Sequence, residues 1–195
     1  MVDQELLQTL GFPTPQAKDL LPEEYLLVAR RIEAARARTI GFLPASNQVG
    51  VPPVVTRLGL ALKRVSGATV GFVDANLRWP AIAARIGADE SEGSSAFVTR
   101  WLDESFALLL PQHEGPAGAG VPELRRLLDD GSELFAHLLV DLTGFRRFGD
   151  HLAAARLVDA LVVVARAHVN TNDELLDLRE ELRESRFLGV LLVDG

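Results

Sequence analysis

Short runs of apolar residues alternate with longer amphipathic segments through most of the chain. Six runs rich in Val, Leu and Phe cover residues 39–44, 69–74, 106–110, 135–141, 161–166 and 187–193. Near-continuous apolar runs of this length are typical of strands covered on both faces, as in a parallel sheet. The segments between them are long enough for crossover helices. The pattern therefore predicts one doubly wound α/β domain, with a mostly parallel sheet of about six or more strands flanked by helices.

Two segments carry the three- and four-residue spacing of amphipathic helices. The first covers residues 22–38 and is locally basic; its arginines are Arg30, Arg31, Arg36 and Arg38. We interpret this basic face as a solvated surface, with docking to an acidic partner or membrane as the alternative. The second helix covers residues 173–185, where Thr171 and Glu174 stand at capping-box spacing.

The remaining segments are expected to be less regular. Residues 1–21 predict a short helix and an irregular N-terminal arm, which leaves 22–195 as the domain. Residues 87–95 and 111–122 are rich in Gly, Pro and Ser and predict loops. Trp101 shares a helical spacing with Phe97, so we expect it in the core.

Composition narrows the classes of function. The 195 residues are 48% hydrophobic and carry a net charge of −7. A negative charge disfavours binding to nucleic acid and favours a protein partner. The chain has no cysteine, and its four histidines show no metal-ligand spacing, so we expect no metal and no cofactor. No signal peptide and no run of about 18 apolar residues is present. A cytoplasmic protein without a transmembrane segment is expected, any recruitment to the inner membrane face being through a partner.

The segment after the first predicted strand stands where a phosphate-binding loop would be expected. Such a loop aims backbone N–H groups at phosphates, a lysine reaches the β and γ oxygens, and a hydroxyl holds Mg²⁺. An apolar-periodic helix, VVTRLGLAL, follows at residues 54–62. The loop positions are Ala45, Ser46, Asn47, Gln48, Val49, Gly50, Val51, Pro52 and Pro53.

Strand, loop, helix and later Asp-ending strands together resemble the MinD/ParA-like ATPases. The resemblance is greatest to the cytoplasmic domains of CapB/CpsD-type bacterial tyrosine kinases, whose loop reads KGGVGKTT or PGEGKTT before a helix such as VAANLALAL. Aligning that helix with residues 54–62 matches Gly50 to the last loop glycine. Val51 then replaces the phosphate-binding lysine, while Pro52 and Pro53 replace the two Thr/Ser positions. The resemblance thus implies a degenerate phosphate loop.

Two acidic positions of the family survive. Residues 71–80, GFVDANLRWP, are similar to the family's VDADLRRP, with Asp74 retained, Asn76 in place of the second acid and Trp79 in place of the second arginine. Residues 138–144 resemble the Walker B strand, with Asp141 at its acidic position. We interpret both acids as remnants; a weak cation site is the alternative.

The resemblance covers residues 22–195 and implies a pseudo-ATPase, or pseudo-tyrosine-kinase, without catalytic residues. Tyr25 is the only tyrosine, whereas the family autophosphorylates a tyrosine cluster. We therefore expect a protein-binding scaffold or regulator in cell-surface polysaccharide or envelope assembly, paired with itself, an active paralogue or a membrane-anchored component. The expected partner contacts are Arg78, Trp79, Arg30 and Arg31. The alternative is a nucleotide-dependent MinD/ParA-like switch or positioning ATPase with an atypical pocket.

Overall fold

The computed structural model describes residues 22–78, 82, 96–112, 115 and 118–193. The expected N-terminal arm, the expected loop at 87–95 and Trp79 lie outside these residues. No helix among the described residues is long and apolar enough to cross a membrane.

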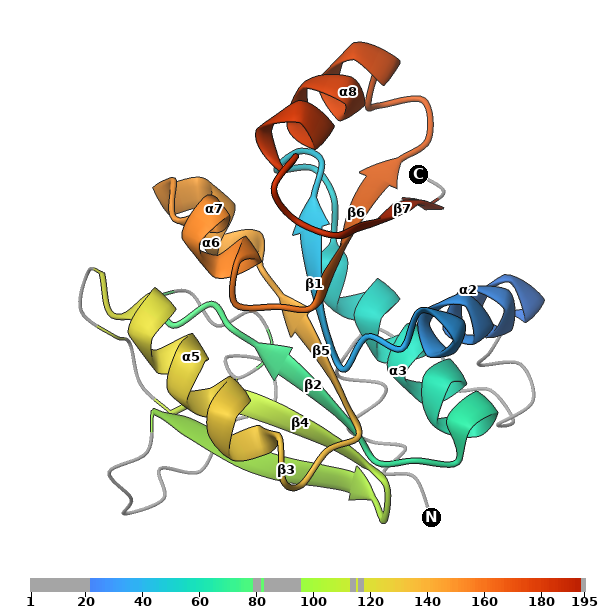
Figure 1. Ribbon diagram of the computed structural model, residues 1–195, viewed down its shortest axis with the longest axis vertical. Helices are drawn as coiled ribbons and strands as arrows, with labels where there is room; N and C mark the ends of the chain where they lie inside the picture. The colour runs from blue at the N-terminus through green and yellow to red at the C-terminus, as the bar shows by residue number, and fades with distance from the viewer. Residues whose placement is uncertain (1–21, 79–81, 83–95, 113–114, 116–117, 194–195) are drawn as a thin grey trace.

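A seven-stranded sheet forms the centre of the protein (Figure 1). Its strands are β1 (Thr39–Pro44), β2 (Val70–Asp74), β3 (Phe97–Asp103), β4 (Phe106–Pro111), β5 (His137–Asp141), β6 (Ala160–Arg166) and β7 (Phe187–Val193). The spatial order is β3-β4-β2-β5-β1-β6-β7, and only the β3–β4 pair is antiparallel. All six predicted strands are present, with ends that shift by up to two residues. The doubly wound, mostly parallel α/β fold is confirmed.

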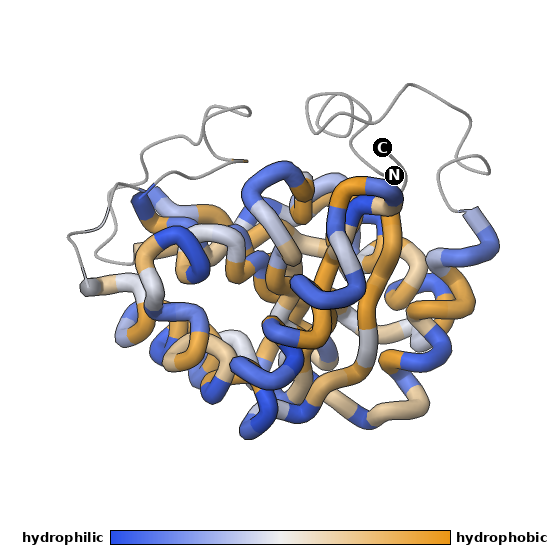
Figure 2. The backbone as a smooth tube through the Cα atoms, turned by 90° about the horizontal axis from the view of Figure 1, so that it is seen from above, coloured by the Kyte–Doolittle hydropathy of each residue, from blue (hydrophilic) through white to orange (hydrophobic). Residues whose placement is uncertain are grey.

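Helices cover both faces of this sheet. The described helices are α2 (Glu23–Ala35), α3 (Val51–Ser66), α5 (Gly120–Gly131), α6 (Thr143–Phe148), α7 (His151–Ala155) and α8 (Asn172–Glu181). α2 and α3 contribute to the apolar core on one face, whereas α5, α6, α7 and α8 contribute to the core on the other. Figure 2 shows the apolar strands between these more mixed helices. Burial on both faces explains why the strand sequences are almost continuously hydrophobic.

The predicted helix caps and boundaries are only partly correct. The Thr171–Glu174 capping box forms at the start of α8, as predicted. α5 begins at Gly120, inside the expected loop, because Pro122 falls in its first turn, where a missing N–H group costs little. α2 ends at Ala35, since Arg36 adopts a left-handed conformation with φ 53°.

Arg38 therefore lies beyond α2 and does not extend the expected basic helix face. Its guanidinium donates hydrogen bonds to the carbonyls of Ser132 and Phe135, the latter at 3.2 Å. Its backbone N–H donates to the Asp159 carboxylate at 2.8 Å. Arg38 thus connects the start of β1 by hydrogen bonds to the segments that precede β5 and β6.

The expectation that Trp101 is a helical core residue is wrong. It lies on β3, an edge strand, and 47% of its surface is exposed. Its ring still stacks on Phe135, with ring centroids 5.5 Å apart. The sequence pattern did not predict β3, because its residues are a mixture of polar and apolar types. An edge strand can have this composition since it is less buried than a central strand.

Candidate functional site: the carboxyl ends of the parallel strands

The loop between β1 and α3 occupies the predicted phosphate-loop position. Ala45 is buried and its N–H donates to the Val164 carbonyl at 2.7 Å. The Val49 N–H donates to the Ser46 carbonyl at 3.2 Å, so this donor is used within the loop. Asn47, Gln48 and Gly50 are exposed. The loop therefore has the expected place in the fold, but part of its backbone donor capacity is directed inwards.

The first turn of α3 contains the three positions, Val51, Pro52 and Pro53, at which the resemblance implied replacements. Val51 is fully buried and belongs to the core beneath α2 and α3. Pro52 and Pro53 follow as the second and third helical residues and carry no N–H group. Thr56 donates its hydroxyl to the Pro52 carbonyl at 2.9 Å. This turn therefore has no cationic side chain for a phosphate. It also lacks two of the backbone N–H groups that a phosphate site would use.

A cavity of about 410 Å³ adjoins the loop on the side of α8. Ala45, Ser46 and Asn47 line it together with Arg146 of α6, whose guanidinium donates to the Pro44 carbonyl. Its remaining polar walls come from α8 and are acidic: Glu174, Asp177 and Glu181. Three carboxylates would repel the phosphates of a nucleotide placed against this side of the loop. The sequence did not predict that these three acidic side chains lie beside the loop, because α8 is far from the loop along the chain.

Asp74 and Asp141 are brought together, as the resemblance implied. They are paired residues at the ends of the neighbouring strands β2 and β5, with 0% and 2% of their surfaces exposed. Asp74 accepts backbone N–H groups from Asn76 at 3.2 Å and Ile82 at 3.0 Å. Asp141 accepts the backbone N–H of Thr143 at 2.9 Å and its hydroxyl at 2.5 Å.

The environment of this pair opposes a double negative charge. Burial raises the pKa of Asp141 to about 7, and the charge of Asp74 contributes to the rise, against the hydrogen bonds from Thr143. Asp141 therefore takes up a proton at a much higher pH than an ordinary aspartate does. Among the described residues, no group of three or more His, Cys, Asp or Glu side chains is placed to hold a metal ion.

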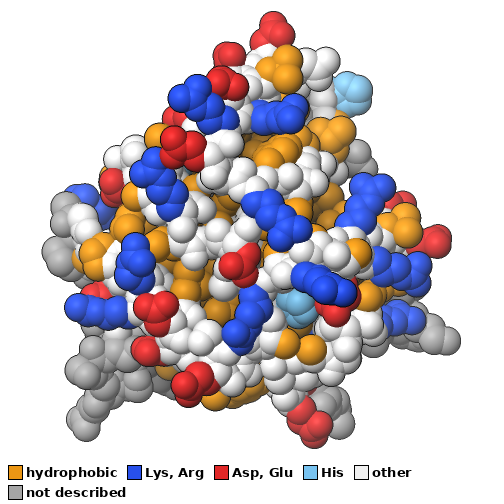
Figure 3. Space-filling view, in the orientation of Figure 1, with side chains coloured by type: hydrophobic (Ala, Val, Ile, Leu, Met, Phe, Trp, Pro, Cys, Tyr) orange, Lys and Arg blue, Asp and Glu red, His pale blue; other side chains and the backbone are white. Residues whose placement is uncertain are grey.

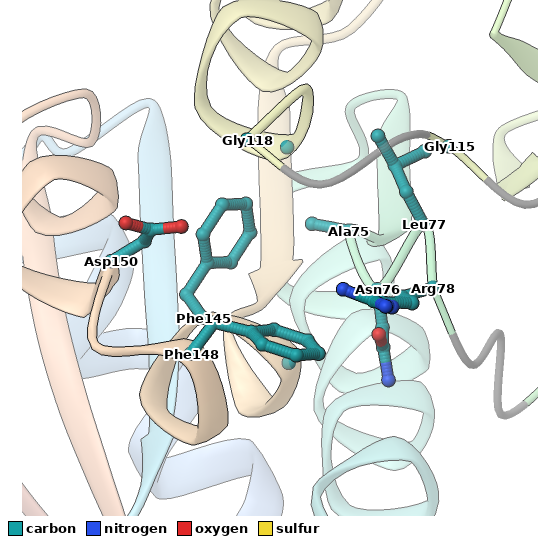
Figure 4. A pocket seen from close by; sticks show the side chains of 11 residues that line it. Ala75, Asn76, Leu77, Arg78, Gly115, Gly118, Phe145, Phe148 and Asp150 are labelled. Atoms are coloured by element: carbon teal, nitrogen blue, oxygen red, sulfur yellow. The ribbon is translucent and has the colours of Figure 1, made fainter.

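A second cavity, of about 220 Å³, opens between the loop after β2 and helix α6 (Figure 4). Phe145 and Phe148 project from α6, with Phe145 next to Gly120 of α5. The Arg78 guanidinium lies 5.3 Å from the centre of the Phe148 ring. This separation is within the range of a cation–π interaction. The sequence indicated Arg78 as a contact residue but not Phe148, whose 42% exposure becomes visible only in the fold.

The close approach of the loop after β2 and the start of α6 shapes this second cavity. Asn76 is buried against Gly144, and a Cβ atom at that glycine would lie 2.6 Å from the Asn76 Oδ1 atom. A side chain at position 144 would therefore displace Asn76. Asn76 thus helps to pack α6 against the end of β2.

Two of the other expected partner contacts, Arg30 and Arg31, lie on a different element. Arg30 and Arg31 are exposed on α2 and do not line the cavity that contains Arg78. Figure 3 shows acidic and basic side chains interspersed over the visible face, without one dominant basic patch. The structure thus separates the expected contacts into two surfaces.

Solved structures with the same architecture include kinase domains and ATPases. The chimeric protein CapA2B2 aligns with a TM-score of 0.73 and 15% identity over 88% of this chain and 83% of that one. The kinase domain of Escherichia coli tyrosine kinase ETK gives 0.68 and 17% over 87% and 76%. A ParA family ATPase from Chlorobium tepidum gives 0.58 and 15% over 81% and 73%.

No protein-family model matches the sequence, and no curated protein matches it significantly. At these identities the structural likeness establishes the fold. The chain is therefore an α/β domain with the P-loop-like fold that these tyrosine kinase domains and ParA-type ATPases share.

Proposed function

We propose that this protein is a pseudo-ATPase, a nucleotide-independent relative of the bacterial tyrosine kinases that serves as a protein-binding scaffold or regulator. The observation that supports this most is the first turn of α3. A fully buried valine stands at the lysine position, and two prolines follow it. The proposed setting, assembly of cell-surface polysaccharide or envelope, comes from the resemblance to the CapB/CpsD-type kinases.

The energetic cost of these replacements is large. Two side-chain contacts and up to two backbone donors are missing, each worth about 1.5 to 3 kcal/mol when charge-assisted. The total is roughly 6 kcal/mol or more, or about four powers of ten in affinity. The acidic residues Glu174, Asp177 and Glu181 beside the loop add repulsion. Micromolar binding in the usual pose would become unmeasurable.

The alternative is a nucleotide-dependent switch that uses Asp74 and Asp141 for Mg²⁺. Their register on β2 and β5 favours it, because two neighbouring carboxylates can share a cation. Mg²⁺ nevertheless usually takes some of its ligands from nucleotide phosphates. Val51 and the two prolines leave those phosphates without their main protein contacts, so we favour the scaffold.

A restored loop tests the proposal directly. The triple variant Val51→Lys, Pro52→Thr, Pro53→Thr reintroduces the charge, the hydroxyls and the N–H groups. We expect calorimetric titration with MgATP to detect binding by this variant and none by the unmodified protein. Circular dichroism checks that the buried position tolerates lysine. A folded variant that still binds no nucleotide would contradict the assignment of residues 45–53 as a degenerate phosphate loop.

The surface around Arg78 and Phe148 is our proposal for the partner contact. An exposed aromatic ring next to a cation is a common anchor in protein interfaces. Proteins captured by the unmodified chain should be lost with Phe148→Ala and retained with Leu152→Ala. Leu152 is a suitable control because its exposure, 39%, is close to the 42% of Phe148. Equal capture by both variants would place the contact elsewhere, with Arg30 and Arg31 the next candidates.

A further inference from the structure

Trp101 on β3 presents part of its indole ring to solvent in a fixed orientation. The ring stacks on that of Phe135, with centroids 5.5 Å apart and an angle of 27° between the ring planes. Phe135 is buried, whereas 47% of Trp101 is exposed. The stack therefore holds the indole against the core and leaves its remaining surface accessible. A tryptophan fixed in this way is a common anchor in protein interfaces, because little side-chain freedom is lost when a partner covers it.

A second exposed apolar side chain lies in the turn between α5 and β5. Leu134 directly precedes Phe135 and is 62% exposed. Its backbone is held in place, because its N–H donates to the Gly131 carbonyl at 3.1 Å and its carbonyl accepts the Thr69 hydroxyl at 3.1 Å. Figure 1 shows this turn passing beside β3. We refer to Trp101, Leu134 and the turn between α5 and β5 as the Trp101 surface.

Four exposed carboxylates border the Trp101 surface; they belong to Glu104, Asp129, Asp130 and Glu133. The last three lie in the final turn of α5 and in the turn that follows it, where the Phe135 N–H donates to the Gly131 carbonyl at 3.0 Å. Glu104 lies between β3 and β4, next to Ser105, whose carbonyl accepts the Val70 N–H at 2.9 Å. Within the described part of the chain, none of these four carboxylates forms an ion pair.

The charge of the Trp101 surface decides which kind of partner can cover it. Arg38 contacts the turn through two carbonyls, and Arg125 lies one helical turn before Asp129, whereas Arg126 is paired with Glu123. Two cations therefore stand against four carboxylates. A second copy would place like charges opposite each other, and nucleic acid or an anionic lipid would also be repelled. A segment rich in Lys and Arg is attracted instead, and its cations can also lie on the face of an indole.

We propose that the Trp101 surface binds a basic segment of a partner protein, with an arginine or lysine side chain on the indole and an apolar side chain against Leu134. This surface is separate from the contact at Arg78 and Phe148. β3 is antiparallel to β4 and ends beside the first residues of β4 and β2, whereas Arg78 follows the carboxyl end of β2. The two surfaces thus lie at opposite ends of the sheet, so that one chain can hold two partners together without any nucleotide.

Fluorescence anisotropy of a labelled peptide of alternating arginine and leucine tests the apolar part of the surface. We expect saturable binding to the unmodified chain, and binding about tenfold weaker for Trp101→Thr and for Leu134→Ser. Circular dichroism checks the fold, and Leu134→Ser keeps both backbone hydrogen bonds if Trp101→Thr fails to fold. Leu176→Ser on the acidic helix α8 is the matched control, because its exposure of 59% is close to that of Leu134. No binding up to millimolar peptide, or equal weakening by Leu134→Ser and Leu176→Ser, would overturn the proposal.

The same titration tests the charged part of the surface. Glu133→Gln should weaken binding of the peptide, and the difference should shrink as salt is added, because exposed charges are screened. Asp177→Asn, which removes an exposed carboxylate on α8, should bind like the unmodified chain. Equal weakening by these two variants would indicate a general attraction between a basic peptide and an acidic protein, and would overturn the proposal. Phe148→Ala should also bind the peptide normally, so a failure of the Arg78 contact can be told apart from a failure of this one.

Discussion

At the residue scale, the proposed absence of a nucleotide site rests most on the buried side chain of Val51. A lysine at this position, as in the restored loop, has to direct its ammonium group out of the core and towards the loop, because burial of that charge is strongly unfavourable. This substitution could be read from the sequence because the helix at residues 54–62 set the register. Its burial could not be read there, because burial depends on contacts with distant residues.

Asp141 provides a prediction at the same scale. Its pKa is about 7 in the folded chain, against 3.8 for an ordinary aspartate. Between these values the folded state binds more protons than the unfolded state, so the free energy of unfolding falls as pH rises. The full penalty is present above about pH 7, and each pKa unit corresponds to about 1.4 kcal/mol.

We therefore expect Asp141→Asn to be more stable than the unmodified protein at about pH 8, with a difference that shrinks towards about pH 5. Thermal unfolding at several pH values measures this. Asp159→Asn is the control of opposite sign: burial raises the pKa of Asp159, but hydrogen bonds from Thr39 and Arg38 outweigh it and hold the pKa below its usual value. An Asp141→Asn variant that is destabilised at about pH 8 would instead indicate that a favourable partner, such as a bound cation, holds the carboxylate.

At the scale of elements, the sequence predicts the buried strands well and the periphery poorly. Strands such as β1 and β7 have nearly uniform apolar sequences, whereas β3 mixes Thr99, Arg100 and Asp103 with apolar residues. The helical spacing of Phe97 and Trp101 was therefore misleading. Two features of the candidate site, the acidic face of α8 and the exposed Phe148, depend on elements that meet only in the folded chain.

Packing of α3 on the sheet gives a prediction at this scale. Gly59 faces Phe106 of β4, and a Cβ atom at Gly59 would lie 2.6 Å from the buried ring. Gly59→Ala should therefore destabilise the protein by about 1 to 3 kcal/mol through overpacking, although alanine is the better helix former. Denaturant unfolding measures the loss. Combining it with Phe106→Leu should cost less than the sum of the two single changes, and strict additivity would refute the steric explanation.

At the scale of the whole molecule, the chain has the fold of the kinase and ATPase domains to which it is similar, and we propose that it does so without their phosphate-binding chemistry. The β1–α3 loop stands at the expected edge of the sheet, and Asp74 and Asp141 lie beside each other at the same edge. Around this edge, Val51 packs into the apolar core and Pro52 and Pro53 carry no N–H group. Acidic side chains of α8 lie beside the loop. The cavity at Arg78 and Phe148 is the surface that we propose for contact with a partner.

Calorimetric titration of the unmodified protein with MgATP and MgADP tests the central claim most directly, because it requires no knowledge of any partner. The proposed pseudo-ATPase predicts no binding up to millimolar nucleotide. Micromolar binding of either nucleotide would contradict it, and loss of that binding in Asp74→Asn would establish the acid pair as part of a working site.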